Sequence, residues 1–393
     1  MTTNLTPPDE LLITKLGINP SNLLADFPSN KLDQYIAVVN WLKKYKPKSG
    51  ATNLEKVQGY LETFHHLCEV KDWKRAKTIL DFRLDTPTDE EFHLQMGTWG
   101  YYEEQTKLYD CFLKNIEDLH PFYKIAFLLG KGSIEYAKGQ YLKAIDYYSQ
   151  AQLFLQLPQD EHQKGVILNN IGLAYLGLEN FNEAKQHFWQ RLIIAWKHQE
   201  LEQEGVALNN LGLVYHEKKE YAKAIKYQKR SLSILRITAN KLGEGSVLDS
   251  LASNYAALGK YSQALEYQEQ RLKIAQEIED RRGEAEAFCN GGITLAILKK
   301  YSEAIESFQK SIEICRTIGT RSIEAYAFTN MAILYVILVD PALALECCDR
   351  ALSIATELGI PLAKQCQELK EKLLNEQTEP MAYQWQIPNS RRN

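Results

Sequence analysis

Histidine, cysteine and glutamate gather between residues 65 and 69, and they are the first side chains along the chain that suggest chemistry. His65, His66, Cys68 and Glu69 all belong to types that ligate transition metals. Neighbouring residues of a helix point about 100° apart, so the two imidazoles cannot face one ion. We therefore predict no metal site here or elsewhere in the chain.

Two other short segments also lack the spacing that their chemistry needs. Gly130 to Ser133 suggests a phosphate loop, but the earlier glycine of G-x-x-x-x-G-K-[ST] is missing. Cys347 and Cys348 are adjacent in an apolar helical pattern, which is more typical of packing than of redox chemistry. The sequence holds no HExxH, GxSxG or CxxC motif. We predict no catalytic residues, no cofactor and no enzyme activity.

Pairs of mostly polar residues recur every 40 positions and are the remaining candidates for a site. The pairs are Asn169–Asn170, Asn209–Asn210, Asp249–Ser250, Cys289–Asn290 and Thr329–Asn330. An Asn amide both donates and accepts, so it can pair with a peptide backbone without reading side chains. Two interpretations stay open: the amides bind a partner's backbone, or they bridge neighbouring helices, because buried amides need a partner.

The interval of 40 belongs to a repeat that organises most of the chain. Aromatic residues stand 40 apart at Tyr101, Tyr141, Phe181, Tyr221, Tyr261 and Tyr301. We call these positions stations, and the next one, 40 residues after Tyr301, is residue 341. An alanine lies three residues after each station from Tyr141 onward: Ala144, Ala184, Ala224, Ala264, Ala304 and Ala344. A small residue precedes each of these stations by nine: Gly132, Gly172, Gly212, Ala252, Gly292 and Ala332. Such regular spacing is typical of repeat proteins.

Each repeat predicts two antiparallel helices. Gly165, Leu168, Gly172 and Tyr175 follow one another at steps of three and four, which places them on one helix face. A short turn at residues 177–180 then leads into a second helix. A single hairpin cannot bury so much apolar surface alone, so stacked hairpins are expected, and the predicted fold is an all-α solenoid.

The segment Asn210-Leu211-Gly212, followed by Tyr215, Tyr221 and Ala224, resembles the signature of the tetratricopeptide repeat family. The resemblance covers residues 122–358 as six repeats, and it implies a right-handed superhelix of antiparallel helix pairs. The 40-residue period is similar to that of the LGN/Pins polarity adaptors and of bacterial tetratricopeptide arrays. Two stations depart from the pattern, because Glu135 replaces a tyrosine and Pro341 an aromatic residue.

The chain outside these repeats divides into four predicted parts. Thr52 with Glu55 and Thr88 with Glu91 both match the capping box that begins a helix. The parts are an N-terminal segment with a capping helix (1–50), two degenerate hairpins (51–121), a C-terminal capping helix (359–376) and a flexible tail (377–393). The degenerate part weakly resembles irregular repeats in bacterial signalling ATPases with tetratricopeptide tails.

The resemblance implies that the first helix of each repeat lines a concave groove in which a partner segment lies. Candidate groove residues are Asn169, Asn170, Asn209, Asn210, His216, Asp249, Asn290, Ile293, Ile297, Asn330 and Ile333. The isoleucines would give an apolar shelf near the C-terminal repeats, although such stripes are equally typical of inter-repeat core. Lys/Arg pairs that would clamp a C-terminal carboxylate have no counterpart on these faces.

Composition narrows the class of partner. A formal net charge of −4 and a pI near 6.1 argue against nucleic-acid binding, which needs clustered cations. The longest apolar run, residues 331–339, is too short to cross a bilayer, and no secretory signal begins the sequence. We expect a cytoplasmic protein.

The predicted function is an adaptor that binds an extended peptide or an amphipathic helix of another protein. We predict no nucleic acid, no membrane insertion and no small-molecule cofactor among its partners. Two alternatives stay open: a peptide-responsive signalling regulator, or a non-catalytic subunit of an ATPase or protease system.

Overall fold

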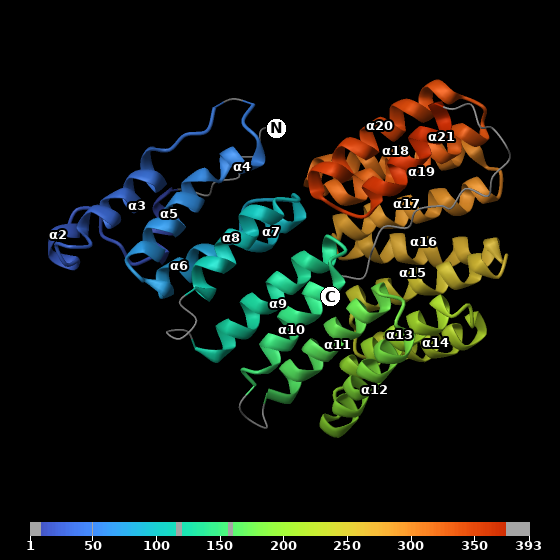
Figure 1. The fold of residues 1–393 in the computed structure, drawn as a ribbon, viewed down its shortest axis with the longest axis horizontal. Helices are drawn as coiled ribbons and strands as arrows, with labels where there is room; N and C mark the ends of the chain where they lie inside the picture. Colours follow the sequence, from blue (N-terminus) through green and yellow to red (C-terminus); the bar gives the residue numbers. More distant parts are fainter. Residues whose placement is uncertain (1–8, 49, 115–119, 156–159, 375–393) are drawn as a thin grey trace. The chain divides into compact units, whose positions relative to one another are not determined.

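The computed structural model describes residues 9–48, 50–114, 120–155 and 160–374, and these are helical almost throughout (Figure 1). Within them there is no β-sheet, only one isolated bridge between Arg83 and Glu91. Contacts within the chain are concentrated in two compact units, an N-terminal unit of residues 1–119 and a C-terminal unit of residues 120–393. The predicted tail at 377–393 lies outside the described residues.

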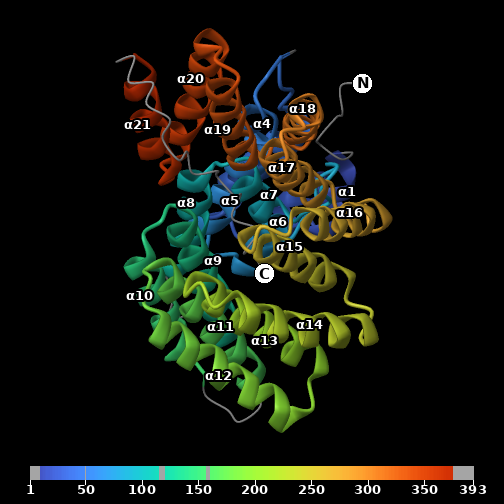
Figure 2. The same cartoon turned by 90° about the vertical axis from the view of Figure 1, so that its right-hand side faces the viewer.

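Within residues 120–155 and 160–374 of the C-terminal unit, six antiparallel hairpins are followed by one closing helix, as expected of an α-solenoid. The first hairpins are α9 (Pro121–Ala137) with α10 (Tyr141–Gln152), α11 (Glu161–Gly177) with α12 (Phe181–His198), and α13 (Leu201–Glu217) with α14 (Tyr221–Ile237). They continue with α15 (Lys241–Ala257) and α16 (Tyr261–Glu277), α17 (Arg281–Ile297) and α18 (Tyr301–Ile318), α19 (Arg321–Ile337) and α20 (Pro341–Leu358), then α21 (Leu362–Leu374). Each second helix also packs on the first helix of the next hairpin, as Figure 2 shows for α11 to α14.

The aromatic station is the first residue of every second helix, and a residue with positive φ stands two positions before it. The turn residues are Gly139, Glu179, Lys219, Gly259, Lys299 and Val339, with φ between 58° and 72°. Pro341 fits this station because the first N–H of a helix has no intrahelical partner, so proline loses nothing there. The departure at residue 341 therefore leaves the hairpin intact.

The two helices of a hairpin approach closely where the small residue of the first faces the residue sixteen positions later in the second. A Cβ atom added to Gly172 would lie 2.6 Å from a ring carbon of Phe188, and one added to Gly292 would lie 2.7 Å from Phe308. Both phenylalanines are fully buried. Glycine at this station therefore makes room for an aromatic ring at the centre of the hairpin.

A buried arginine joins the two central repeats. Arg271 of α16 donates from Nε to Asp249 Oδ2 of α15 (3.1 Å) and from Nη2 to Asp280 Oδ2 at the start of α17 (2.9 Å). Gly245 and Gly283 leave the space that the guanidinium occupies. Burial raises the pKa of the Asp249 carboxyl, against the opposing effect of the Arg271 charge. The ionised carboxylate thus depends on its arginine.

The N-terminal unit holds shorter helices: α1 (Asp9–Lys15), α2 (Leu23–Asp26), α3 (Leu32–Lys44), α4 (Asn53–Lys56), α5 (Gln58–Glu69), α6 (Trp73–Leu80), α7 (Phe92–Thr98) and α8 (Tyr102–Leu113). Its core is aromatic, and Phe112 of α8 lies 5.6 Å from both Phe64 of α5 and Trp73 of α6, ring centre to ring centre. The α5–α6 and α7–α8 pairs occupy the places predicted for the degenerate hairpins.

One of the two predicted capping boxes is confirmed and the other is wrong. Thr52 Oγ1 accepts from the backbone N–H of Glu55, and the Glu55 carboxylate accepts from that of Thr52. Thr88, in contrast, hydrogen-bonds to the Gln95 side chain, and α7 begins only after Glu91. The helix starts later because other local contacts engage both side chains: Thr88 bonds to Gln95, and the Glu91 carboxylate contacts His93.

Neighbouring glycines in α17 give a matched test of the hairpin packing. Gly292→Ala should destabilise the protein by about 1–3 kcal/mol, because its new Cβ would overlap Phe308. A Cβ at Gly291 would meet nothing within 4 Å, so Gly291→Ala should stabilise by about 0.5–1 kcal/mol through helix propensity. Urea unfolding would measure both. Equal effects of the two substitutions would contradict the proposed close approach.

The Arg271 contact predicts a pH-dependent loss of stability. Arg271→Ser should cost about 3–5 kcal/mol at neutral pH, because it strands the Asp249 charge in the core. In the folded protein the pKa of the Asp249 carboxyl lies above the ordinary value of 3.8. As the pH rises from 3.8 through this folded-state pKa, ionisation of the buried carboxyl lowers the free energy of unfolding. The deficit should therefore shrink as the pH falls towards about 4.

The chain supplies the control for this variant, since the preceding repeat carries Asn209 and Ser231 at the same two positions. The double variant Asp249→Asn with Arg271→Ser copies that combination and should recover a large part of the lost stability. Urea midpoints at neutral and acidic pH would check both expectations. A pH-independent deficit in the single variant would exclude the stranded charge as its cause.

Candidate partner-binding face

The predicted groove residues all lie on the first helices of the second to sixth hairpins, α11, α13, α15, α17 and α19. The structure links many of them to one another. The direct bonds between repeats are Asn210 Nδ2 to Asn169 Oδ1 (2.5 Å), Asn290 Nδ2 to Asp249 Oδ1 (3.5 Å) and Asn330 Nδ2 to Cys289 Sγ (3.6 Å). In each, the second member of a pair donates to the first member of the pair one repeat earlier. We name this series the amide ladder.

The amide ladder is interrupted between α13 and α15. Ser250 occupies the donor position there, but its hydroxyl bonds to the Ser246 carbonyl of its own helix (3.0 Å). Among the described residues, Asn209 Oδ1 consequently has no hydrogen-bond partner, although the side chain is buried. This junction therefore lacks the bond between repeats that the other three junctions have.

Burial divides the predicted residues into two groups. Most amides of the ladder are buried, and so are Ile293 and Ile333, which makes them part of the packing between helices. Asn170, at the start of the ladder, is half-buried and accepts weakly from Asn169 Nδ2 (3.4 Å). Ile297 is also half-buried. Asn170 and Ile297 are therefore the predicted amide and isoleucine that keep some surface for a partner.

His216 lies near the end of α13 and is half-buried. Its Nδ1 lies 3.0 Å from Asn254 Oδ1 of α15, and its ring packs edge-on against Tyr221. The imidazole therefore also connects two neighbouring repeats.

Helix α15 presents a polar face beside the interruption. Ser246, Ser250 and Ser253 succeed one another at steps of four and three, and all three are half-buried. The corresponding residues of α13 are Val206, Asn210 and Leu213. The middle of the array is therefore more polar, with smaller side chains, than the repeat before it.

Helix α17, the first helix of the next hairpin, carries a buried negative charge. Glu286 is 5% exposed and forms an ion pair with Arg282 of the same helix at 3.3 Å. Burial raises the pKa of the Glu286 carboxyl, opposed by the Arg282 charge. The central repeats therefore hold a buried, ion-paired carboxylate as well as the unmet Asn209 oxygen.

Three buried cysteines of the C-terminal unit carry weakly acidic thiols. Burial raises the pKa of Cys347 to about 11 and those of Cys289 and Cys348 to about 12. A thiol is nucleophilic only as the thiolate, so these side chains are unreactive at neutral pH. Cys348 Sγ instead donates to the Cys366 carbonyl, which agrees with the packing role predicted for the vicinal pair.

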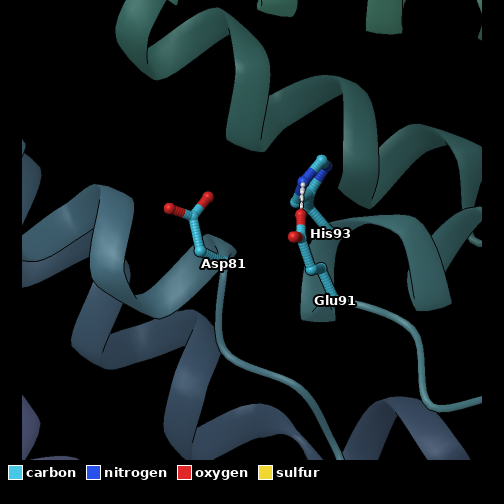
Figure 3. Close-up of side chains that lie close together, drawn as sticks. All are labelled: Asp81, Glu91 and His93. Atoms are coloured by element: carbon cyan, nitrogen blue, oxygen red, sulfur yellow. Dashed lines mark hydrogen bonds and ion pairs between the residues drawn. The ribbon is translucent and has the colours of Figure 1, made fainter.

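The sequence interpretation overlooked one group of side chains that could hold a metal ion. Among the described residues, Asp81, Glu91 and His93 of the N-terminal unit place one ligand atom each within 4.8 Å of the others (Figure 3). The Glu-x-His spacing of Glu91 and His93 could have indicated this group in the sequence, but Glu91 was interpreted there as part of a capping box.

Helices long and apolar enough to cross a membrane do not occur in the part of the chain that the structure describes.

Comparison with known proteins identifies the repeat. One tetratricopeptide repeat model matches residues 203–277, and a second matches residues 166–188 and 285–318. A search of curated protein sequences found no match. The predicted similarity to the 40-residue repeats of polarity adaptors stays a prediction.

Three solved structures are similar in fold. A Rap protein complexed with competence and sporulation factor has a TM-score of 0.52 and 13% identity, over 82% of this chain and 99% of that chain. The apo form of RapI has a TM-score of 0.51 and 15% identity, over 68% of this chain and 96% of that chain.

The third is a signal transduction ATPase with numerous domains from Pyrococcus horikoshii, which carries a tetratricopeptide repeat sensor. Its TM-score is 0.50 and its identity 17%, over 98% of this chain and 62% of that chain. At such identities the likeness shows the fold alone. The repeat models identify tetratricopeptide repeats between residues 166 and 318, and the likeness of fold agrees with them. Repeats of this kind form helical scaffolds for protein interactions.

Proposed function

We propose that this scaffold holds a segment of a partner protein along the first helices of its repeats, centred on α15. The observation that carries the proposal is the interrupted amide ladder. Asn209 Oδ1 is an acceptor without a partner in the described structure, beside a helix whose face is lined with serines. An unmet buried acceptor costs about 1–3 kcal/mol, which a peptide N–H arriving there would recover.

The neighbouring repeats explain why the segment is held at this junction. On either side, an amide of the ladder donates to the preceding repeat, although Asn290 Oδ1 also lacks a partner in the described structure. The serines of α15 are shorter than the residues of α13 at the same positions, so they give the partner's backbone room to approach. The half-buried Asn170 and Ile297 supply a polar and an apolar contact in other repeats.

Completing the ladder should abolish this site without harming the fold. Ser250→Asn supplies the amide that Asn210, Asn290 and Asn330 supply at the other junctions, so its Nδ2 should reach Asn209 Oδ1. We expect about 0.5–1.5 kcal/mol of added stability from the new hydrogen bond. Partner recovery in affinity capture from native extract, quantified by mass spectrometry, should fall.

Ser233→Asn on the exposed face of α14 is the control, because it makes the same chemical change away from the ladder. It should leave both stability and partner recovery at the wild-type level. Undiminished recovery with Ser250→Asn, in a protein of raised stability, would refute the proposed groove. A Ser250→Asn variant of unchanged stability would instead refute the unmet acceptor on which the proposal rests.

A peptide-responsive regulator is the second candidate function. The fold resembles that of a Rap protein captured in complex with competence and sporulation factor. Because each repeat contacts only its neighbours, a ligand at the α13–α15 junction could alter the curvature of the whole array. Solution scattering with and without captured peptide would distinguish the two functions, since a static adaptor keeps its dimensions.

A further inference from the structure

The loop between α6 and α7 brings together two carboxylates and an imidazole. Asp81 follows the last residue of α6, Glu91 is the N-cap of α7, and His93 is the second residue of α7. The backbone N–H of Phe92 donates to the Phe82 carbonyl at 2.7 Å, which closes the loop at its base. Two helix ends therefore hold the three side chains near one another (Figure 3).

The three ligand atoms suit a small divalent cation. They lie within 4.8 Å of one another, and imidazole nitrogen with carboxylate oxygen is a common ligand set for zinc. Zinc bonds to these atoms at about 2.0–2.2 Å, so the ligands of one ion stand roughly 3.5 Å apart. Asp81 is exposed, so its side chain has room to move towards the other two ligands.

The environment of His93 orients the ring as zinc sites require. Nδ1 lies 2.7 Å from the Tyr109 hydroxyl, which in turn accepts from Gln105 Nε2 at 3.0 Å. With its proton on Nδ1, the ring donates to Tyr109 and turns the lone pair of Nε2 towards Glu91, 3.1 Å away. Metal-ligating histidines characteristically donate their other N–H in this way.

The contact between His93 and Glu91 bears on which ring nitrogen carries the proton. A neutral imidazole with its lone pair facing a carboxylate is repelled unless a cation lies between them. Lys77 places a positive charge at the edge of the group, where it forms an ion pair with Asp81.

We propose that Asp81, Glu91 and His93 bind one zinc-type divalent cation, with a remaining coordination position open to water. The ion would tie the end of α6 to the start of α7 and would replace Lys77 as the partner of Asp81. The competing interpretation is a hydrogen-bond chain in which Tyr109 donates to His93 and protonated Nε2 donates to Glu91.

Calorimetric titration of the full-length chain, purified without a histidine tag, with Zn²⁺ tests the proposal. We expect one ion per chain at this site, and a binding constant reduced at least about tenfold by Glu91→Gln or His93→Gln. Lys77→Ala should tighten binding, because Asp81 then loses a competing cation. Co²⁺ absorption should show d–d bands without thiolate charge transfer, which separates this site from the cysteines.

His198→Gln is the matched control, since His198 also lies beside a carboxylate, that of Glu161, but on the exposed surface of α12. It should leave the binding constant unchanged. If His93→Gln impairs folding, Glu91→Gln still tests the site, because the amide keeps the size of the carboxylate. Absence of Zn²⁺ binding by the folded wild type, or binding that survives Glu91→Gln, would overturn the proposal and favour the hydrogen-bond chain.

Discussion

The close approach of the two helices in each hairpin is the constraint on which the array depends. It requires a small residue in the first helix, because the residue sixteen positions later fills the same space. Where that later residue is Phe188 or Phe308, the small residue is glycine. Where it is Cys348, the small residue is Ala332. The pairing fixes the spacing within a hairpin, and stacking then repeats it along the chain.

That packing also decides which polar groups must find partners. Helices this close exclude water from the first helices, so the buried amides pair across repeats. Three junctions achieve this with a donor from the next repeat, whereas the Ser250 hydroxyl bonds within its own helix. A repeat therefore specifies the fold through its constant positions and leaves Asn209, at a variable junction, available for function.

The sequence predicted the hairpins well because their information is local and repeated. Helical spacing and turn positions recur often enough to locate even the helix that begins at Pro341. The hydrogen bonds of the amide ladder could not be predicted from the sequence, because whether Asn210 bonds to Asn169 depends on how two hairpins stack. The capping box at Thr88 failed for a different reason: two local motifs compete for Glu91, and the carboxylate contacts His93 two residues later instead of capping the helix, while Thr88 bonds to Gln95.

Departures from a repeat can be separated into those that packing explains and those that it does not. Arg271 replaces the serine found at Ser231 and Ser311, and two glycines and two carboxylates compensate for it, so this departure is structural. At Ser250 the bond between repeats is missing, and Asn209 Oδ1 is one of several buried side-chain atoms, Arg271 Nη1 among them, that have no partner in the described structure. A protein that tolerates an unmet buried acceptor gives up stability there. The α13–α15 junction is therefore the one that differs from the other ladder junctions in its hydrogen bonding, and the proposed binding site rests on that difference.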